Sequence, residues 1–218
     1  GAIANLAHNK KQAIVITTFV SVICCWLNWG FGLVAGALLA KEIAKRVRDV
    51  DYPLLIASAY SGFVIWHAGF SGSIPLSLVE GKAFGDVTYQ APITETLFHP
   101  VNLVMVLIIL FVMPLINYAM HPDKDHTICV DPALLTDEKE RTYKIETPAD
   151  KMEHSKILWA ILVIACWAYI VMYFVKNGFT LGLNIVNFLF MTLGLTLHGN
   201  LRKYVDAISD AAGGAAGI

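Results

Sequence analysis

Five apolar stretches constrain this chain more than any other feature of its sequence. They cover residues 13–40, 52–79, 101–120, 157–175 and 179–197. A helix needs about 20 predominantly apolar residues to cross the hydrocarbon core of a bilayer. None of the five stretches contains Asp, Glu, Lys or Arg. The pattern predicts an all-α, polytopic membrane protein.

The first two stretches differ from the others because each is 28 residues long. A continuous helix of that length measures about 42 Å, whereas the hydrocarbon core is about 30 Å thick. Glycine and polar residues interrupt both stretches near the middle, at residues 28–32 and 69–75. We therefore expect the helix to be broken at both places, since such residues free backbone groups inside the membrane.

Basic residues flank the first stretch on both sides. Lys10 and Lys11 precede it, and four more basic residues follow it between positions 41 and 48. Loops rich in Lys and Arg lie on the cytoplasmic side. We therefore expect the stretch to enter and leave the membrane by the same face, as a re-entrant helix hairpin with residues 28–32 at its tip. The second stretch is then a broken transmembrane helix.

The resulting topology gives a strong charge bias between the two sides of the membrane. It places the loop of residues 121–156 in the cytoplasm, together with fourteen of the sixteen Lys and Arg residues. Only Lys82 and Lys176 fall on the outer side. A plain crossing of the first stretch would instead put basic clusters on both faces, so the hairpin topology fits the bias better.

Composition excludes several other classes of protein. Hydrophobic residues make up 56% of the 218 positions and charged residues 15%, which is far from the composition of a disordered chain. The net charge of -1 gives no basic field for nucleic acid. The four cysteines have no regular spacing, which argues against a disulfide framework or a zinc cluster.

Two helix breaks in one membrane domain are typical of the substrate sites of secondary transporters, where the ends of discontinuous helices point at an anionic group. Asparagine amide, serine hydroxyl and glycine backbone donors, with no acidic neighbour, suit a carboxylate. The predicted substrate-binding residues are Asn28, Trp29, Gly30, Gly32, Ser71, Gly72 and Ser73. A packing role for the glycines is the alternative, because Gly32, Gly36 and Ala40 form a row of small residues four apart.

Histidines provide the other candidates for chemistry. His67 precedes the second break and could carry a proton or contact substrate, although a structural hydrogen bond is the more ordinary role. The segment 121–126 contains two histidines and two aspartates, but it belongs to a charged, solvated loop. We therefore expect no metal site and no resident cofactor. We also expect no catalytic residue, because no nucleophile and base are suitably spaced. The coupling ion, H⁺ or Na⁺, is left open.

Two strings in these stretches closely resemble the bacterial short-chain fatty acid transporter family. They are NWGFGLV-x-G at residues 28–36 and GFSGSIPL at residues 69–76. Further similar segments are residues 41–46, 51–57, 172–174, 184–191 and 207–209. The family carries acetoacetate, butyrate and similar acids across the inner membrane, and it looks like a branch of the ion-transporter superfamily. The resemblance implies that residues 28–32 form a hairpin tip beside an unwound helix at residues 69–75.

The resemblance also sets our expectation for the whole protein. Family members are about twice as long and carry a second hairpin and a second broken helix. We therefore expect residues 1–218 to be one membrane domain within a longer carrier. The predicted function is symport of a short monocarboxylate by a multi-pass inner-membrane protein. Its partners are the substrate and the lipid bilayer, without nucleic acid, and homo-oligomer formation is left open. The alternative is a channel or a structural membrane subunit that lacks transport.

Overall fold

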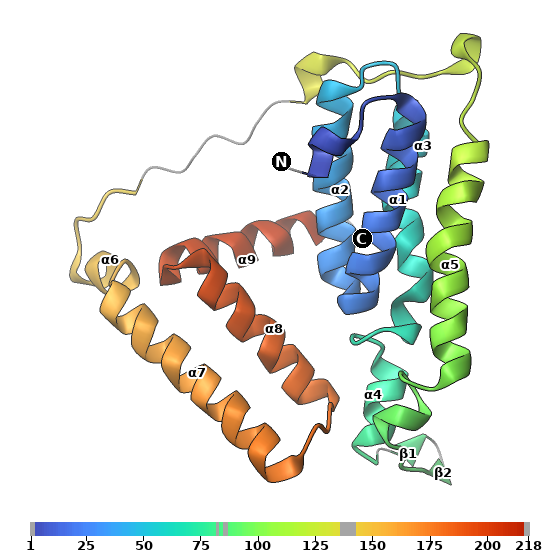
Figure 1. The fold of residues 1–218 in the computed structure, drawn as a ribbon. Helices are drawn as coiled ribbons and strands as arrows, with labels where there is room; N and C mark the ends of the chain where they lie inside the picture. Colours follow the sequence, from blue (N-terminus) through green and yellow to red (C-terminus); the bar gives the residue numbers. More distant parts are fainter. Residues whose placement is uncertain (1–2, 82, 85–86, 136–142, 216–218) are drawn as a thin grey trace. The chain divides into compact units, whose positions relative to one another are not determined.

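The computed structural model describes residues 3–81, 83–84, 87–135 and 143–215, in two compact units, Gly1–Glu138 and Lys139–Ile218 (Figure 1). The predicted all-α fold class is confirmed, since helices form all the described regular elements except one short pair of strands. Lys82 and residues 136–142 of the loop at 121–156, which entered the charge argument, lie outside the described residues.

The first unit contains two strands, five α-helices and several short 3-10 helices among its described residues. In chain order these are η1 (Ile3–Leu6), α1 (Lys10–Leu27), α2 (Trp29–Arg46), α3 (Tyr52–Ser61), η2 (Gly62–Ala68), α4 (Ser73–Val79), β1 (Ala83–Phe84), β2 (Val87–Thr88), η3 (Ile93–Glu95), α5 (Pro100–Ala119), η4 (Lys124–His126) and η5 (Pro132–Leu134). β1 and β2 pair antiparallel.

The first apolar stretch forms a hairpin of two helices, α1 and α2, which lie side by side (Figure 1). Each helix has 18 residues and is therefore about 27 Å long. The predicted break at residues 28–32 is narrower than expected. Asn28 alone leaves the helical conformation, and residues 29–32 already belong to α2. The hairpin is observed, and its entry from one face of the bilayer stays a prediction.

The second apolar stretch is broken as predicted, although the form of the break differs. After α3, the chain tightens into the seven-residue 3-10 helix η2, which the sequence pattern did not indicate. The unwound turn covers residues 69–72. Residues 73–75, which we expected in the break, form the first turn of α4. The break is therefore a 3-10 segment followed by a four-residue turn.

A glycine at the start of η2 lets α1 pack closely against this part of the chain. A Cβ atom on Gly62 would lie 2.4 Å from the backbone carbonyl carbon of Ser21, so no larger residue fits there without movement. A buried polar contact joins three helices, because the amide of Asn117 on α5 donates to the hydroxyls of Thr18 and Ser61, both at 3.0 Å. These contacts hold α1, α3 and α5 together.

A carboxylate at the start of α3 ties down the segment that follows α5. One oxygen of Asp51 accepts from the backbone N–H of Leu54 and caps α3, and the other accepts from the N–H of Ile128, both at 2.9 Å. Tyr52 N–H donates to Ile128 C=O at 2.8 Å. His121 Nε2 accepts from Asp51 N–H at 3.3 Å. The histidine that we weighed as a metal ligand therefore has a structural contact.

The described residues of the second unit, 143–215, form four helices, α6 (Pro148–Glu153), α7 (Lys156–Asn177), α8 (Leu183–His198) and α9 (Leu201–Ala215). Two tryptophans of α7 donate to α8. Trp159 Nε1 bonds Leu195 C=O at 2.8 Å and Trp167 Nε1 bonds Thr196 Oγ1 at 3.1 Å. The helix in the fifth apolar stretch begins later than predicted, because Gly178, with a positive φ of 62°, starts a turn.

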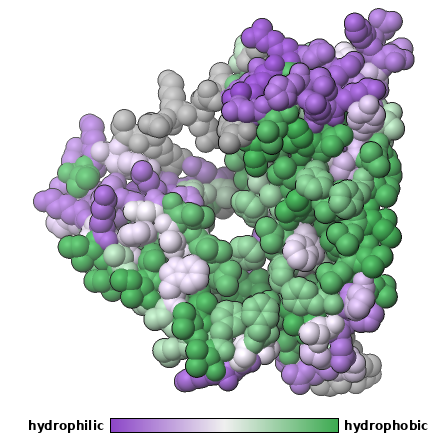
Figure 2. All heavy atoms as spheres, viewed as in Figure 1, coloured by the Kyte–Doolittle hydropathy of each residue, from purple (hydrophilic) through white to green (hydrophobic). Residues whose placement is uncertain are grey.

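Within the part of the chain that the structure describes, four helical segments are long and apolar enough to cross a membrane, judged by length and composition. They are Lys10–Leu27, Tyr52–Val79, Pro100–Ala119 and Lys156–Asn177, while α8 is shorter than a full span. In the first unit, hydrophilic residues gather at the end where α1 begins and α2 ends, and hydrophobic residues cover α5 (Figure 2). Large apolar side chains on α5, such as Leu107 and Phe111, are exposed. These features confirm a polytopic membrane protein.

Candidate functional site

The tip of the α1–α2 hairpin is organised by Asn28. Its backbone N–H donates to Cys24 C=O and ends α1, while its side-chain oxygen accepts from Phe31 N–H at 2.9 Å and caps α2. A side-chain acceptor at this position satisfies one of the free N–H groups at a helix start. One asparagine thus closes one helix and opens the next, which explains why the break needs a single residue.

The tip touches the unwound turn directly through hydrogen bonds. Trp29 N–H, in the first turn of α2, donates to Ser71 Oγ at 2.9 Å. Phe70 N–H donates to Trp26 C=O at 2.9 Å, and the indole N–H of Trp26 donates to Ala68 C=O at 3.0 Å. The two helix breaks that are 42 residues apart in sequence therefore meet at one place in the fold.

Close backbone approach at this meeting requires glycine. A Cβ atom on Gly69 would lie 2.1 Å from Trp26 O, and one on Gly72 would lie 2.7 Å from His67 O. Contacts of this length are far inside van der Waals distance, and the crowding atoms are backbone atoms that cannot rotate away. The absence of a side chain at Gly69 thus lets the backbone of Trp26 approach the unwound turn, and Gly72 allows the tight turn before α4.

The seven predicted substrate-binding residues do not all lie at the contact. Asn28, Trp29 and Ser71 meet there, and Gly30 adjoins them in the first turn of α2. Gly32 instead packs against α1, where its Cβ would lie 2.3 Å from Cys25 Sγ, so it has the packing role that we gave as the alternative. Gly72 and Ser73 flank the contact, Gly72 as the residue before α4 and Ser73 as its exposed first residue.

Two side chains at the site were absent from our predictions. The amide of Asn102, near the start of α5, donates to both Ala68 C=O and Leu97 C=O, at 3.1 and 2.8 Å. Its signal in the sequence is a polar residue within an apolar span. Phe63 stacks edge-on against Trp29, with ring centroids 5.8 Å apart. It has no such signal, because an aromatic residue in an apolar stretch is ordinary.

The aromatic residues form one continuous wall beside the tip. Trp66 contacts Trp29 and Phe63, with ring centroids 5.7 and 4.9 Å apart, and His67 lies against Trp66 at 4.1 Å. His67 is exposed, so it is available to a partner as well as to its aromatic neighbour. The wall places aromatic surface beside the N-terminus of α2.

The electrostatic character of the site is set by helix ends and by hydrogen-bond donors. The N-terminus of α2 presents positive partial charge at the tip, next to the C-terminus of α1, which presents negative partial charge. No Asp or Glu occurs in residues 13–40 or 52–79. The hydroxyl of Ser71 accepts from Trp29, which leaves its own hydrogen free to donate.

An apolar cavity of about 350 Å³ lies next to the contact. Its lining comes from α1, η2 and α5, and it consists of Val22, Ile23, Trp26, Ile65, Leu103, Val106, Leu107 and Leu110. Trp26 belongs to both places, because it lines the cavity while its carbonyl accepts from Phe70 N–H in the unwound turn and its indole N–H donates to Ala68 C=O at the end of η2. A molecule with a polar head and a short apolar tail matches this combination.

Metal binding finds no support in the part of the chain that the structure describes. No group of three or more His, Cys, Asp or Glu side chains there could hold an ion. The segment 121–126 uses His121 to contact Asp51 and the backbone of Pro122. The absence of a resident metal or cofactor stays a prediction.

Sequence comparison relates the chain to known proteins. A model of the family described as "Short chain fatty acid transporter" matches residues 1–218. The chain is 40% identical over 219 residues to a protein of Escherichia coli named "Putative short-chain fatty acid transporter", and 39% identical over 227 residues to a protein of the same name in Haemophilus influenzae. The alignments cover 99% of this chain but 50% and 51% of those proteins, so the chain spans about half the length of the curated relatives it matches. No solved structure matches it.

Proposed function

Because the chain belongs to the short-chain fatty acid transporter family, we propose that it supplies one half of the substrate site of a secondary carrier. The substrates are short monocarboxylates such as acetoacetate and butyrate, and the membrane is the bacterial inner membrane. The carboxylate binds where the hairpin tip meets the unwound turn. The alkyl part extends into the apolar cavity beside Trp26.

The observation that carries this proposal is the hydrogen bond from Trp29 N–H to Ser71 Oγ. It brings a helix N-terminus and a serine hydroxyl together where the two breaks meet. The two apolar stretches that contain these breaks have no Asp or Glu. Such half-helix ends are where secondary carriers hold anionic substrates. The apolar stretches also lack Lys and Arg, so they offer no partner for a second negative charge, and this supports a monocarboxylate over a dicarboxylate.

Transport would proceed by alternating access, coupled to H⁺ or Na⁺. The described residues of the site provide hydrogen-bond donors and an apolar wall, and they bind and orient the substrate without changing its covalent structure. A protein of this kind is a transporter, not an enzyme. A channel, or a structural subunit without transport, is the alternative.

Uptake of labelled butyrate into proteoliposomes containing the complete carrier, with residues 1–218 as one part, tests the proposal. A carrier gives saturable uptake and exchanges internal unlabelled butyrate for external label, whereas a channel conducts without such counterflow. Saturable uptake with counterflow is the expected result. Conductance without counterflow would replace the carrier with a channel, and no flux of either kind would favour the structural subunit.

Two substitutions test the site itself. S71A and N28A each remove a group at the contact, and loss of one hydrogen bond to a charged substrate raises KM by about 10-fold to 100-fold. S77A is the matched control, because Ser77 lies on α4 and away from the tip contact. Uptake with an unchanged KM in both S71A and N28A would remove the site assignment while leaving the transport function intact.

A further inference from the structure

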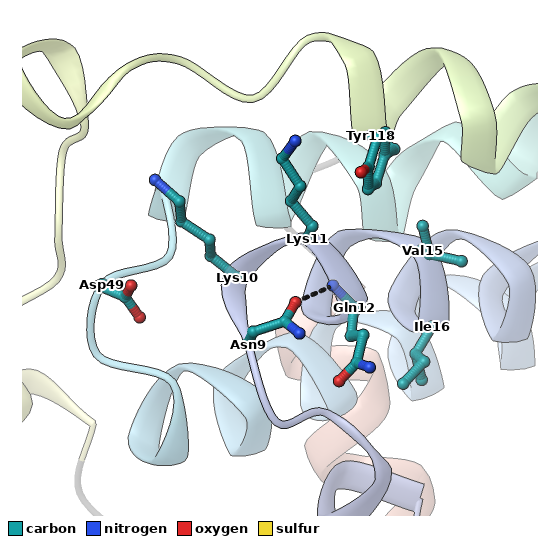
Figure 3. A pocket seen from close by; sticks show the side chains of 8 residues that line it. All are labelled: Asn9, Lys10, Lys11, Gln12, Val15, Ile16, Asp49 and Tyr118. Atoms are coloured by element: carbon teal, nitrogen blue, oxygen red, sulfur yellow. Dashed lines mark hydrogen bonds between the residues drawn. The ribbon is translucent and has the colours of Figure 1, made fainter.

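A second cavity, of about 530 Å³, lies at the opposite end of α1 from the hairpin tip (Figure 3). Lys10 and Leu27 are 17 residues apart along α1, so the two ends are separated by about 25 Å. The lining includes Lys10 and Lys11 at the start of α1, Asp49 from the connection between α2 and α3, and Tyr118 near the end of α5. This cavity is distinct from the proposed carboxylate site.

The cavity carries net positive charge. Lys10 and Lys11 line it, and Asp49 is its one acidic lining residue. Neither lysine forms an ion pair with an acidic side chain in the described part of the chain. Lys11 Nζ lies 4.6 Å from the centre of the Tyr118 ring, a cation–π distance between two residues that line the cavity. The first turn of α1 has no acidic residue and adds the positive end of a helix dipole.

The cavity becomes apolar within one and a half turns of α1. Val15 and Ile16, both half-buried, line it below the two lysines, on the side toward the apolar body of the helix. Tyr118 lies at the same boundary, where aromatic residues are enriched in membrane proteins. A small inorganic anion would need the lysines and leave the apolar wall unused. A phospholipid has both a phosphate and the beginning of its acyl chains, in the same order.

We propose that this cavity binds the headgroup of an anionic phospholipid, with the phosphate at Lys10 and Lys11 and the acyl chains against Val15 and Ile16. The position agrees with the predicted topology, in which the start of α1 faces the cytoplasm. Anionic lipids of that leaflet attract basic residues near the membrane surface. The bound lipid anchors the open end of the hairpin in the interface.

Binding is measured on the purified protein in neutral detergent with three probes, dioctanoyl phosphatidylglycerol, dioctanoyl phosphatidylcholine and inorganic phosphate, by titration calorimetry. Phosphatidylglycerol should bind more tightly than the other two. The K10Q/K11Q variant should bind it about 30-fold more weakly. Each basic residue near an anionic surface contributes a factor of about 5.5 to affinity, and the two factors multiply to about 30. K10R/K11R should retain binding, which separates loss of charge from loss of folding.

R46Q/R48Q is the control, since it removes two exposed charges from the same end of the hairpin without touching the cavity lining. It should bind phosphatidylglycerol as the unsubstituted protein does. Equal weakening in R46Q/R48Q and K10Q/K11Q would mean general attraction to a basic surface and would overturn the proposal. Equal affinity for inorganic phosphate would assign the cavity to a free anion instead, and unchanged binding in K10Q/K11Q would place the lipid elsewhere.

Discussion

Replacement of Gly69 by alanine is the sharpest test of the contact between the hairpin tip and the unwound turn. The backbone at Gly69 has a φ of -116°, a value that any residue adopts, so alanine brings no conformational strain. The added methyl group is the only change. It would lie 2.1 Å from Trp26 O and within 3 Å of two other backbone atoms of Trp26.

The cost of this substitution follows from the distances. An ordinary contact of a Cβ atom starts at about 3.4 Å, so the two backbones must separate by about 1.3 Å. This movement lengthens the 2.9 Å bond from Phe70 N–H to Trp26 C=O beyond hydrogen-bond range and strains the 3.0 Å bond from the Trp26 indole to Ala68. Loss of the first bond and weakening of the second together cost about 1–3 kcal/mol, and overpacking adds about 1–3 kcal/mol. We expect G69A to lower the free energy of unfolding by about 2–6 kcal/mol.

Denaturant titration in detergent micelles, followed by tryptophan fluorescence, measures the effect. G30A is the matched control, because its Cβ would lie 3.4 Å from the Asn28 side-chain oxygen and touch nothing closer. Alanine is also the better helix former, so G30A should leave stability unchanged or raise it by up to about 1 kcal/mol. A G69A protein within about 0.5 kcal/mol of the unsubstituted protein would refute the close approach of the tip to the turn.

Three further predictions concern polar side chains. N28A should destabilise the protein by about 1 kcal/mol through loss of the α2 cap, and N28D should not; equal melting temperatures for both would exclude the capping role. N117A should cost about 1–3 kcal/mol in denaturant titration because the buried hydroxyl of Thr18 and the half-buried hydroxyl of Ser61 lose their donor, whereas N187A, at an exposed position of α8, should cost little. Hydrogen bonds from the hydroxyl and the backbone N–H of Thr147 lower the pKa of Asp150 below its ordinary value of about 3.9. The ionised carboxylate therefore stabilises α6 above that pH, and this stabilisation is lost as the pH falls through the lowered pKa. The protection of α6 amides from hydrogen exchange, relative to the intrinsic exchange rate at each pH, should fall in this acid range, and D150N should abolish this pH dependence.

The positions of the helices could be predicted because length and hydropathy determine them. The third and fourth apolar stretches became α5 (Pro100–Ala119) and α7 (Lys156–Asn177) within two residues of their predicted ends. Glycine-rich breaks in over-long stretches also indicated where the helices end. The 3-10 helix η2 (Gly62–Ala68) could not be predicted, because its geometry results from packing of Gly62 against the Ser21 backbone of another helix.

The candidate site was predictable in position but not in the role of each glycine. Composition cannot tell a glycine that ends a helix from one that lets two helices touch. Gly32 illustrates the problem, because it lies within a predicted break and yet packs against Cys25 in a regular helix. Asn28 could be assigned to the break because asparagine caps helices. Ser71 was assigned for its hydroxyl, and its bond to Trp29 N–H appears only in three dimensions.

The capping of α3 by Asp51 has a consequence for the order in which contacts form while the chain is synthesised. Its carboxylate bonds Leu54 N–H, three residues away, and also Ile128 N–H, 77 residues away. During synthesis the first bond can form as soon as α3 leaves the ribosome, but the second must wait until residue 128 has emerged. For that interval one oxygen of the carboxylate has water as its partner. The contact between the start of α3 and the segment after α5 is therefore one of the last to form in this unit, because it needs both Asp51 and Ile128.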